Sequence, residues 1–341
     1  MEPLTYISPE NPREPEPPRY SYKRILFFVA IALVFIILGS TKNHSISISN
    51  PFNNNDDGGI ALPFQTPDPD YDMPAKESDR IDILIMGIRG ENDVDADTGG
   101  PLLTDSIQLF SYSKTTGKSS LVSIPRDLYV TIHDNKKDKI NSAYEYGLSH
   151  SSNSLKFIKE KISQITGVYV DQVVVFDFSS FQEIVDALGG VDVTLAVPFS
   201  ESQQWGYAFS LPAGVNHLDG KNALYYARSR YSSSDFDRSR RQQQIIFAIK
   251  DKLLQLNFLS DPVKSFSILN LIRNDIKTDI GIWNIKQTLD LANEVKVDQI
   301  KRSVISTENF LIEGKENGSY VLTPKTGNFG EIKKFFQDIL K

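Results

Sequence analysis

The chain has 341 residues and no cysteine. It therefore has no disulfide framework, no thiol nucleophile and no cysteine ligands for zinc or an iron–sulfur cluster. Positive charge is also in short supply: 37 lysine and arginine residues face 43 aspartate and glutamate residues, which leaves a formal net charge of −6. Nucleic-acid-binding domains are usually basic, so we expect no nucleic-acid partner.

Proline is rare in most of the chain. Eleven of the 17 prolines lie within the first 74 residues, and six lie after them. We therefore place the folded domain at residues 79–341. The stretch in front of it, residues 42–78, is rich in asparagine, aspartate, glycine, serine and proline. This composition predicts a flexible extracytoplasmic stalk with an end-to-end distance of about 30–35 Å.

Long apolar runs are absent except for one, from Ile25 to Gly39, which uncharged residues extend to position 41. At about 1.5 Å per residue the run is near the lower limit for a membrane-spanning helix, so a cleaved signal peptide is the alternative to a retained anchor. The polar segment before the run is long for a signal peptide, and no clear A-x-A cleavage pattern follows it. We therefore predict a transmembrane anchor over residues 25–41.

The charges around this run predict its orientation. Four basic residues precede it, and Lys42 is the only nearby basic residue after it. The positive-inside rule then makes residues 1–24 a cytoplasmic tail and places the rest of the chain after Lys42 outside. The prediction is a single-pass protein of the cell membrane with an extracytoplasmic C-terminal domain.

From residue 82 onward, strand patterns alternate with helical ones, which predicts an α/β domain. We expect a buried strand at residues 82–87, a hairpin with its loop centred on Thr116, a strand–helix–strand unit with a parallel pair over 171–197, helices at 237–256, 283–295 and 328–340, and a strand at 319–324.

Arginines concentrate in one place. Five of the 13 lie within 14 consecutive residues that contain no lysine: Arg228, Arg230, Arg238, Arg240 and Arg241. The planar guanidinium group binds two oxygens of a phosphate or carboxylate at once. This composition therefore favours an anion-binding site.

Local structure is expected to bring these arginines together. The first two fall on one side of an extended segment. On the helix that follows, Arg238, Arg241 and Gln242 share a face, and we expect Asp235 to cap the N-terminus. A helix N-terminus flanked by arginines binds anions. The alternative is a solvated basic face paired with Asp235 and Asp237.

The predicted hairpin supplies acidic residues. With a loop centred on Thr116, Asp105 lies opposite Asp127, and Ser106 lies opposite Arg126. Like charges directly opposed are unfavourable unless a cation lies between them, and either Arg126 or a bound metal could be that cation. Oxygen ligands beside a phosphate suit Mg²⁺, or Mn²⁺ in its place. The alternative is that Asp105 caps the strand entry and Asp127 lies in a local turn.

Two other metal patterns fail. The Asp-rich stretch 91–100 has the look of a calcium-binding loop, but Thr98 stands where the turn needs glycine and Thr104 stands where a glutamate is needed. The four histidines are scattered and form no H-x-x-x-H pair for zinc.

Taken together, these motifs resemble the LytR-CpsA-Psr family of membrane-anchored cell-wall ligases. The segments that carry the resemblance are LLTDSIQLFSYSKTTGKSSLVSIPRDLYV, KINSAYEYG, VVVFDFSSFQEIVDALGGVDV, HLDGKNALYYARSRYSSSDFDRSRRQQ and SYVLTP. The resemblance covers residues 80–341 and implies a three-layer α/β/α domain whose mixed sheet encloses an apolar pocket for a polyprenyl tail.

The resemblance also implies a reaction and its partners. Family members transfer a glycopolymer from a polyprenyl-pyrophosphate carrier to a muramic acid hydroxyl of peptidoglycan by phosphoryl transfer. The expected partners are therefore the lipid-linked glycan, peptidoglycan and the membrane. By position, the resemblance implies that the pyrophosphate is held by Arg126 of SIPRD, Arg228 and Arg230 of ARSR, and Arg238 and Gln242 of DRSRRQ, and that Asp105 of LTDS is a magnesium ligand.

Two positions depart from the family pattern. Family members often have G-x-D-x-R after the first strand, where this chain reads Gly87-Ile88-Arg89-Gly90-Glu91. They often have arginine two residues before the aspartate at position 105, where this chain has Leu103. We expect Glu91 or Asp93 to substitute for the first acidic metal ligand.

The residue patterns and the family resemblance predict the same mechanism. Phosphoryl transfer needs positioning and charge neutralisation, which arginines and a metal supply. We expect Arg126, Arg228 and Arg230 to act in catalysis, with Asp127 either orienting Arg126 or accepting the proton of the attacking hydroxyl. The alternatives are a pyrophosphate hydrolase with water as the acceptor, and a non-catalytic lipid-binding protein of wall assembly or regulation.

Overall fold

The computed structural model describes residues 73–90, 100–255, 276–280 and 299–341. The expected cytoplasmic tail, the transmembrane anchor and most of the stalk lie outside these ranges, as do Glu91, Asp93 and the helix expected at residues 283–295. In the part of the chain that is described, no helix has the length and apolar character needed to cross a bilayer.

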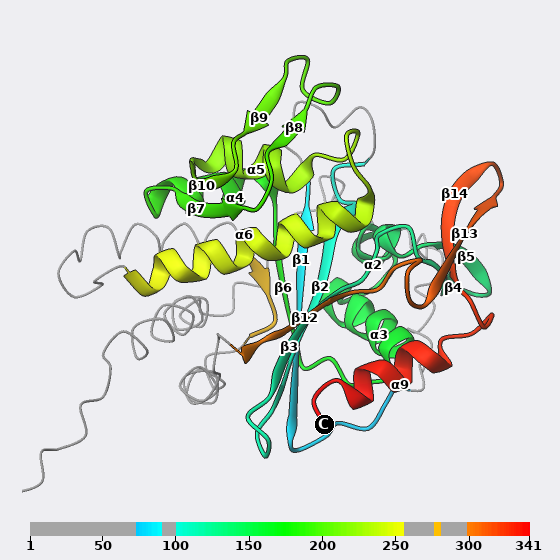
Figure 1. Cartoon of the computed structure of the whole chain (residues 1–341). Helices are drawn as coiled ribbons and strands as arrows, with labels where there is room; N and C mark the ends of the chain where they lie inside the picture. The colour runs from blue at the N-terminus through cyan, green and yellow to red at the C-terminus, as the bar shows by residue number, and fades with distance from the viewer. Residues whose placement is uncertain (1–72, 91–99, 256–275, 281–298) are drawn as a thin grey trace, which may run out of the picture.

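Within the described residues, six strands form a mixed sheet at the centre of the domain (Figure 1). In spatial order they are β11 (Lys277–Thr278), β6 (Gln172–Phe176), β1 (Arg80–Ile88), β2 (Thr104–Ser113), β3 (Ser119–Ser123) and β12 (Lys301–Val304). β2 pairs antiparallel with both β1 and β3, whereas β1–β6 and β3–β12 are parallel pairs. The mixed sheet that the family resemblance implies is therefore confirmed.

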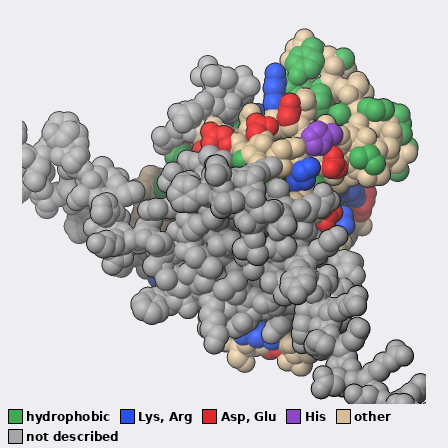
Figure 2. Space-filling model, turned by 90° about the vertical axis from the view of Figure 1, so that its left-hand side faces the viewer, with side chains coloured by type: hydrophobic (Ala, Val, Ile, Leu, Met, Phe, Trp, Pro, Cys, Tyr) green, Lys and Arg blue, Asp and Glu red, His purple; other side chains and the backbone are tan. Residues whose placement is uncertain are grey.

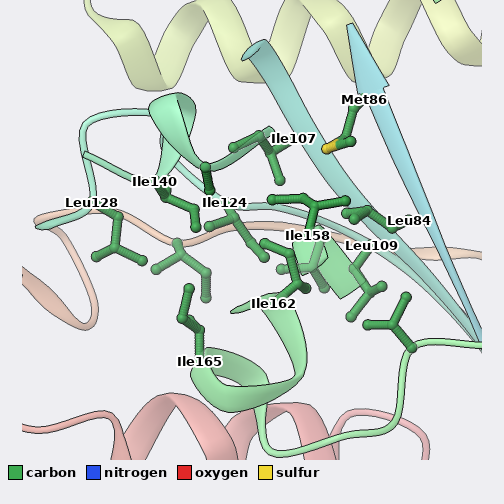
Figure 3. Close-up of a cluster of buried hydrophobic side chains, with 14 of the residues drawn as sticks. Leu84, Met86, Ile107, Leu109, Ile124, Leu128, Ile140, Ile158, Ile162 and Ile165 are labelled. Carbon is green, nitrogen blue, oxygen red and sulfur yellow. The ribbon is translucent and has the colours of Figure 1, made fainter. Parts of the chain in front are cut away.

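One face of the sheet is covered by α2 (Ala143–His150), α3 (Ser154–Thr166) and α9 (Gly330–Asp338) (Figure 1). Side chains at alternate strand positions, such as Leu84 and Leu109, point to this face because successive strand residues alternate between faces. There they meet Ile158 and Ile162 of α3 in a buried cluster (Figure 3). This cluster is the main core.

The opposite face is covered by α6 (Asp235–Gln255), with α4 (Phe178–Ala187) and α5 (Gly220–Arg228) beyond it (Figure 1). Gln243 of α6 donates from Nε2 to Ser123 Oγ of β3 at 2.9 Å and to the Ser303 carbonyl of β12 at 2.8 Å, so α6 crosses these two strands. A second hydrophobic cluster joins α4, α5 and α6 to one another. Helices on both faces give the three layers that the resemblance implied.

The expected parallel strand–helix–strand unit is wrong in its pairing. β6 does pair in parallel, but with β1. The strand after α4, β7 (Val191–Leu195), instead pairs antiparallel with β10 (Gly214–Leu218) in a separate two-stranded sheet. Burial explains the difference: β7 alternates buried and exposed residues, so it covers one side of the second cluster, whereas a central strand between two helical layers is covered on both faces.

Three further hairpins flank the central sheet: β4 (Tyr129–His133) with β5 (Lys136–Lys139), β8 (Phe199–Glu201) with β9 (Phe209–Leu211), and β13 (Leu311–Glu316) with β14 (Ser319–Pro324). The expected strand at residues 319–324 is thus confirmed. Figure 2 shows hydrophobic side chains on the upper part of the described surface, to which β7–β10 belong. Val197, Tyr207 and Val215 of this region are exposed.

Candidate active site

A cavity of about 570 Å³ lies between the second face of the sheet and helices α4, α5 and α6. Part of its wall is apolar, and that part consists of Phe176, Phe178, Phe181, Leu224, Ala227, Ile245 and Ile246. Charged side chains in the wall are Arg89, Asp105, Arg126, Arg228, Arg230 and Arg238. Five guanidinium groups against one carboxylate make this part of the cavity electropositive.

Arg89, Asp105 and Arg126 meet at one edge of the sheet. Arg89 directly follows β1, Asp105 is the second residue of β2, and Arg126 lies three residues beyond β3. Because β2 runs antiparallel to both of its neighbours, the ends of β1 and β3 lie beside the start of β2. The sheet topology thus brings together three charges that are far apart in sequence.

The register of the β2–β3 hairpin differs from the prediction by one residue. Ser111 pairs with Ser120 and Gln108 with Ser123, because the loop has four residues, 114–117, with Gly117 at a positive φ of 66°. A shift of one residue changes every partner across the hairpin. Asp105 therefore lies against Arg126 and not opposite Asp127.

Arg126 is the cation between the acidic residues. One of its Nη1 hydrogens is donated to Asp105 Oδ1, and its Nε lies 3.6 Å from Asp127 Oδ2 and 3.7 Å from Asp235 Oδ2. Burial opposes the charge of Arg126, but the carboxylates of Asp105, Asp235 and Asp127 outweigh it and raise the pKa of the guanidinium. Burial also opposes the charge of Asp105, but Arg126 and Arg238 outweigh it and lower the pKa of that carboxyl.

Arg238 is compensated less well than Arg126. Its side chain is buried, with Nη2 3.4 Å from Asp235 Oδ2. Burial, together with repulsion from Arg126, lowers its pKa to about 10 in spite of the nearby carboxylates. Its buried Nε, like that of Arg126, has no hydrogen-bond acceptor among the described residues. An anionic ligand in the cavity would supply both the missing charge and an acceptor.

Arg228 and Arg230 both line the cavity, as their spacing predicts. Arg228 is the last residue of α5, and its guanidinium lies 4.2 Å from the centre of the Phe178 ring and 5.3 Å from that of Trp205. These ring contacts orient the guanidinium by cation–π attraction. Arginine 230 follows after one extended residue, Ser229.

The other two arginines of the cluster do not reach the cavity. Arg241 is buried beside it and donates from Nε to the Tyr226 carbonyl at 3.0 Å and from Nη2 to the Ser229 carbonyl. Of the three residues expected on one face of α6, Arg238 and Gln242 line the cavity and Arg241 does not. Arg240 is exposed and pairs with Asp237 at 2.8 Å, so the solvated-face alternative holds for this residue.

The helix α6 is capped by Ser234 and not by Asp235. Ser234 Oγ accepts from the Asp237 backbone N–H at 3.1 Å, and Asp237 Oδ2 accepts from the Ser234 backbone N–H at 3.1 Å. This reciprocal pair is a capping box. Asp235, the first helical residue, instead faces Arg126 and Arg238, and their charges lower the pKa of its carboxyl against the effect of burial.

Asp127 and Gln242 differ in their relation to the cavity. Gln242 lines it, as predicted, whereas Asp127 is buried and is not part of the wall. Lys139 donates from Nζ to Asp127 Oδ1 at 2.6 Å, while the other carboxylate oxygen faces Arg126. Arg89, Gln204, Trp205 and Tyr231 are among the wall residues that the sequence did not predict for the site. Two of them had a signal in the sequence: Arg89 directly follows a buried strand, and Tyr231 directly follows the ARSR motif. Gln204 and Trp205 lie in a loop outside the quoted motifs.

The donor side chains of the described residues decide which metal sites are possible. Within the described ranges, no group of three or more histidine, aspartate or glutamate side chains could hold an ion. Mg²⁺ usually needs only one or two carboxylates, with substrate phosphates and water completing its shell. Asp105 is the one carboxylate in the described cavity wall. Arg126 donates to its Oδ1, and Arg89 Nε lies 3.6 Å from its Oδ2. Glu91 and Asp93 lie outside the described residues.

Comparison with known proteins identifies the family, because the LytR_cpsA_psr family model matches residues 40–337. The chain belongs to the LytR-CpsA-Psr family. A relative from Oceanobacillus iheyensis, polyisoprenyl-teichoic acid–peptidoglycan teichoic acid transferase TagU, is 31% identical over 216 residues, which are 63% of this chain and 63% of the relative. Regulatory protein MsrR of Staphylococcus aureus is 29% identical over 272 residues, 79% of this chain and 78% of the relative.

Solved structures of the family share the fold. TagV of B. subtilis matches 77% of this chain and 98% of its own, with a TM-score of 0.59 and 24% identity. TagU of B. subtilis matches 77% of this chain and 97% of its own, with a TM-score of 0.54 and 26% identity. TagT bound to LIIa-WTA matches 77% of this chain with a TM-score of 0.58 and 24% identity.

Proposed function

We propose that this LytR-CpsA-Psr protein transfers a glycopolymer from a polyprenyl-pyrophosphate carrier to a muramic acid hydroxyl of peptidoglycan. The observation that supports this most strongly is one cavity wall that is apolar in one part and carries five arginines in another. A lipid pyrophosphate has the same two parts. The buried Nε atoms of Arg126 and Arg238 have no acceptor among the described residues, and a phosphate oxygen would supply one.

The reaction is a displacement at phosphorus. The acceptor hydroxyl oxygen forms a bond to the phosphorus that bears the glycan, and the bond from that phosphorus to the oxygen of polyprenyl phosphate breaks. The hydroxyl proton passes to a base, and polyprenyl phosphate leaves with the electron pair. Arg126, Arg228, Arg230 and Arg238, with Gln242, would hold the phosphate oxygens and stabilise the charge that develops on them.

Asp127 is better suited to orienting Arg126 than to accepting the proton. It lies outside the cavity wall, and its two carboxylate oxygens face Lys139 and Arg126. A base must reach the hydroxyl directly or through one water. We therefore assign Asp127 to holding the Arg126 side chain toward the cavity.

Asp105 would hold Mg²⁺ or Mn²⁺, with Glu91 or Asp93 as a second ligand. When bound, such an ion neutralises negative charge on the phosphate oxygens. The remaining neutralisation comes from the arginines of the wall. Asp105 also keeps Arg126 in place through its Oδ1.

Two further observations support the proposed class and location. The TagU relative is named as a transferase that acts between a polyisoprenyl-linked teichoic acid and peptidoglycan. The apolar run at residues 25–41, read as an anchor with the tail at 1–24 in the cytoplasm, would keep the domain at the membrane that holds its carrier lipid. The domain would then act on peptidoglycan outside the cell membrane.

The test uses the full-length protein and a polyprenyl-pyrophosphoryl oligosaccharide, with and without a peptidoglycan acceptor. A transferase yields polyprenyl monophosphate together with a sugar-phosphate-muramyl product, and its turnover depends on the acceptor because a site poor in water favours a bound hydroxyl. Equal turnover without acceptor would show a hydrolase. Retention of the lipid without any turnover would contradict the proposed function and leave only lipid binding.

A further inference from the structure

Two of the proposed phosphate-binding arginines lie on a short backbone segment that has to leave a helix. α5 ends at Arg228, and Ser229 is extended, with φ of −55° and ψ of 133°. Beyond that point the helical hydrogen bonds stop, so the segment Arg228–Arg230 needs other partners for its backbone groups. Those partners set where both side chains begin.

The structure assigns this positioning role to Gln204, in the loop between β8 and β9; the assignment rests on the proposed function. Gln204 Nε2 donates to the Arg228 carbonyl at 3.2 Å, and Gln204 Oε1 accepts from the Arg230 backbone N–H at 2.8 Å. One side-chain amide thus bridges the carbonyl of one arginine and the N–H of the next. It pairs with this backbone as a neighbouring strand would.

The residues beside Gln204 hold the same segment. Trp205 Nε1 donates to Ser229 Oγ at 3.1 Å, and its ring lies flat on the Tyr225 ring at 4.2 Å between centres. Glu201 Oε2 accepts from the Ser232 backbone N–H at 3.0 Å and from Ser232 Oγ at 3.1 Å. The loop from Glu201 to Trp205 therefore fixes the chain on both sides of Arg230.

Every backbone group of the segment is then satisfied. The Ser229 N–H is donated to the Tyr225 carbonyl at 2.9 Å, the Ser229 carbonyl accepts from Arg241, and the Arg230 carbonyl accepts from the Ser233 N–H at 3.1 Å. Gln204 provides bonds at the remaining two groups, the Arg228 carbonyl and the Arg230 N–H. Removing its amide frees the backbone between the two arginines and leaves the rest of the network intact.

A small error in this segment would matter for the reaction. A displacement of about 1 Å in groups that hold a reacting substrate can lower the rate by about 100-fold. Gln204 also lies in the cavity wall, next to Arg228 and Trp205. It is therefore a positioning residue for the arginines, and it acts through their backbone.

The experiment compares Gln204→Met with Gln203→Met in the full-length protein. Methionine keeps the size of the side chain and loses both hydrogen bonds, and Gln203 is an exposed neighbour that serves as a matched control. The first readout is amide hydrogen exchange, which needs no ligand. We expect about 10-fold faster exchange of the Arg230 amide in Gln204→Met, with α5 unchanged, because an amide without its acceptor opens locally. Wild-type exchange at Arg230 would overturn the assignment, whatever the protein binds.

The second readout is the dissociation constant of geranyl pyrophosphate, a short polyprenyl pyrophosphate, measured by calorimetry. We expect Gln204→Met to weaken binding by about 10-fold with unchanged stoichiometry, and to have no further effect in an Arg228→Ala/Arg230→Ala background, because residues that act through one another are not additive. A purely structural role would lower the stoichiometry or act equally in both backgrounds, and either result would overturn the assignment. No binding by the wild type would count against the proposed function, and the exchange readout would still decide the role of Gln204.

Gln204→Glu is a second variant that tests the same bridge if Gln204→Met fails to fold. A carboxylate still accepts from the Arg230 N–H but cannot donate to the Arg228 carbonyl. We expect Arg230 exchange close to that of the wild type and weaker geranyl pyrophosphate binding, since one of the two bonds is kept. Fast Arg230 exchange in this variant would overturn the bridging geometry.

Discussion

Arg126 and Arg238 both line the cavity but differ in how well nearby carboxylates compensate their charges. Carboxylates raise the pKa of Arg126, whereas burial and repulsion lower that of Arg238 to about 10. A cation whose pKa is raised by folding stabilises the folded state at all pH values below its unfolded pKa, which for arginine lies far above neutral pH. A cation whose pKa is lowered destabilises it over the same range. At neutral pH the two residues therefore have opposite effects on stability.

Replacing each of them by methionine should reveal this difference. Arg126→Met should lower Tm, because it leaves Asp105, Asp127 and Asp235 without their shared cation. Arg238→Met should leave Tm unchanged or raise it, because it removes a poorly compensated buried charge. Both variants should lose transfer activity. Thermal unfolding at pH 7 with a transfer assay checks this, and a large loss of stability in Arg238→Met would show that its charge is well compensated in the free protein.

Arg228 and Arg230, the other two proposed phosphate-binding arginines, should matter for activity and little for stability. Arg228→Ala or Arg230→Ala should cost about 2–4 kcal/mol of transition-state stabilisation, as the loss of a preorganised contact to an oxyanion does. Tm should change little, since the hydrogen bonds of this backbone segment do not use either side chain. Arg240→Ala is the control, because this arginine is exposed and pairs with Asp237. Wild-type kcat/KM in either test variant would show that the replaced arginine does not hold the phosphate.

Among the helices and strands, the N-terminus of α6 positions several residues of the candidate site. The capping box of Ser234 and Asp237 begins the helix, and Asp235, Arg238 and Gln242 follow within its first two turns. Ser234→Ala should lower the free energy of unfolding by about 1 kcal/mol, the usual effect of losing such a cap. Ser233→Ala is the matched control, because Ser233 Oγ is buried without a partner among the described residues and its loss should not destabilise the protein. Denaturant unfolding measures both; equal effects would mean that the cap contributes nothing.

Local patterns predicted the elements themselves. The spacing of apolar residues placed α6, α9 and β14, and the loop glycine indicated the β2–β3 hairpin. The register was wrong by one residue because it depends on the number of loop residues, which the sequence leaves open between four and five. The same one-residue shift brings Asp105, and not Ser106, against Arg126.

Pairing between distant elements could not be predicted in the same way. The partner of β7 is β10 and not β6, because β7 covers one side of the second hydrophobic cluster. Gln204 is a similar case, because its two hydrogen bonds reach 24 and 26 residues along the chain. Five neighbouring arginines suggested an anion site, but only the three-dimensional structure separates the three in the cavity wall from Arg240 and Arg241.

At the scale of the whole molecule, the central sheet has a different role on each face. The face toward α3 and α9 carries the main core, whereas the face toward α4, α5 and α6 leaves room for the cavity (Figure 1). The chain as a whole is acidic, at −6, while the described cavity wall is strongly positive. Positive charge is thus concentrated where the proposed pyrophosphate would bind.

The proposed metal ion would contribute to the same balance of charge in the cavity. Transfer should require Mg²⁺ or Mn²⁺, stop in EDTA and recover when the ion is added back, because Asp105 offers a carboxylate beside the proposed phosphate site. Asp105→Asn keeps the shape of the side chain and loses its charge, so Mg²⁺ should stimulate this variant less. In the wild type, Mg²⁺ should also increase the thermal stabilisation produced by geranyl pyrophosphate, an effect that Asp105→Asn should lack.

Asp235→Asn separates loss of a metal ligand from loss of arginine compensation. Asp235 approaches Arg126 and Arg238 as Asp105 approaches Arg126, but it is not part of the cavity wall. This variant should therefore keep the full response to Mg²⁺. If Asp235→Asn lost that response as well, the effect of Asp105→Asn would come from disturbing the arginines. Full wild-type activity in EDTA would contradict the metal prediction itself, and the guanidinium groups of the wall, Arg89 included, would then have to neutralise the pyrophosphate by themselves.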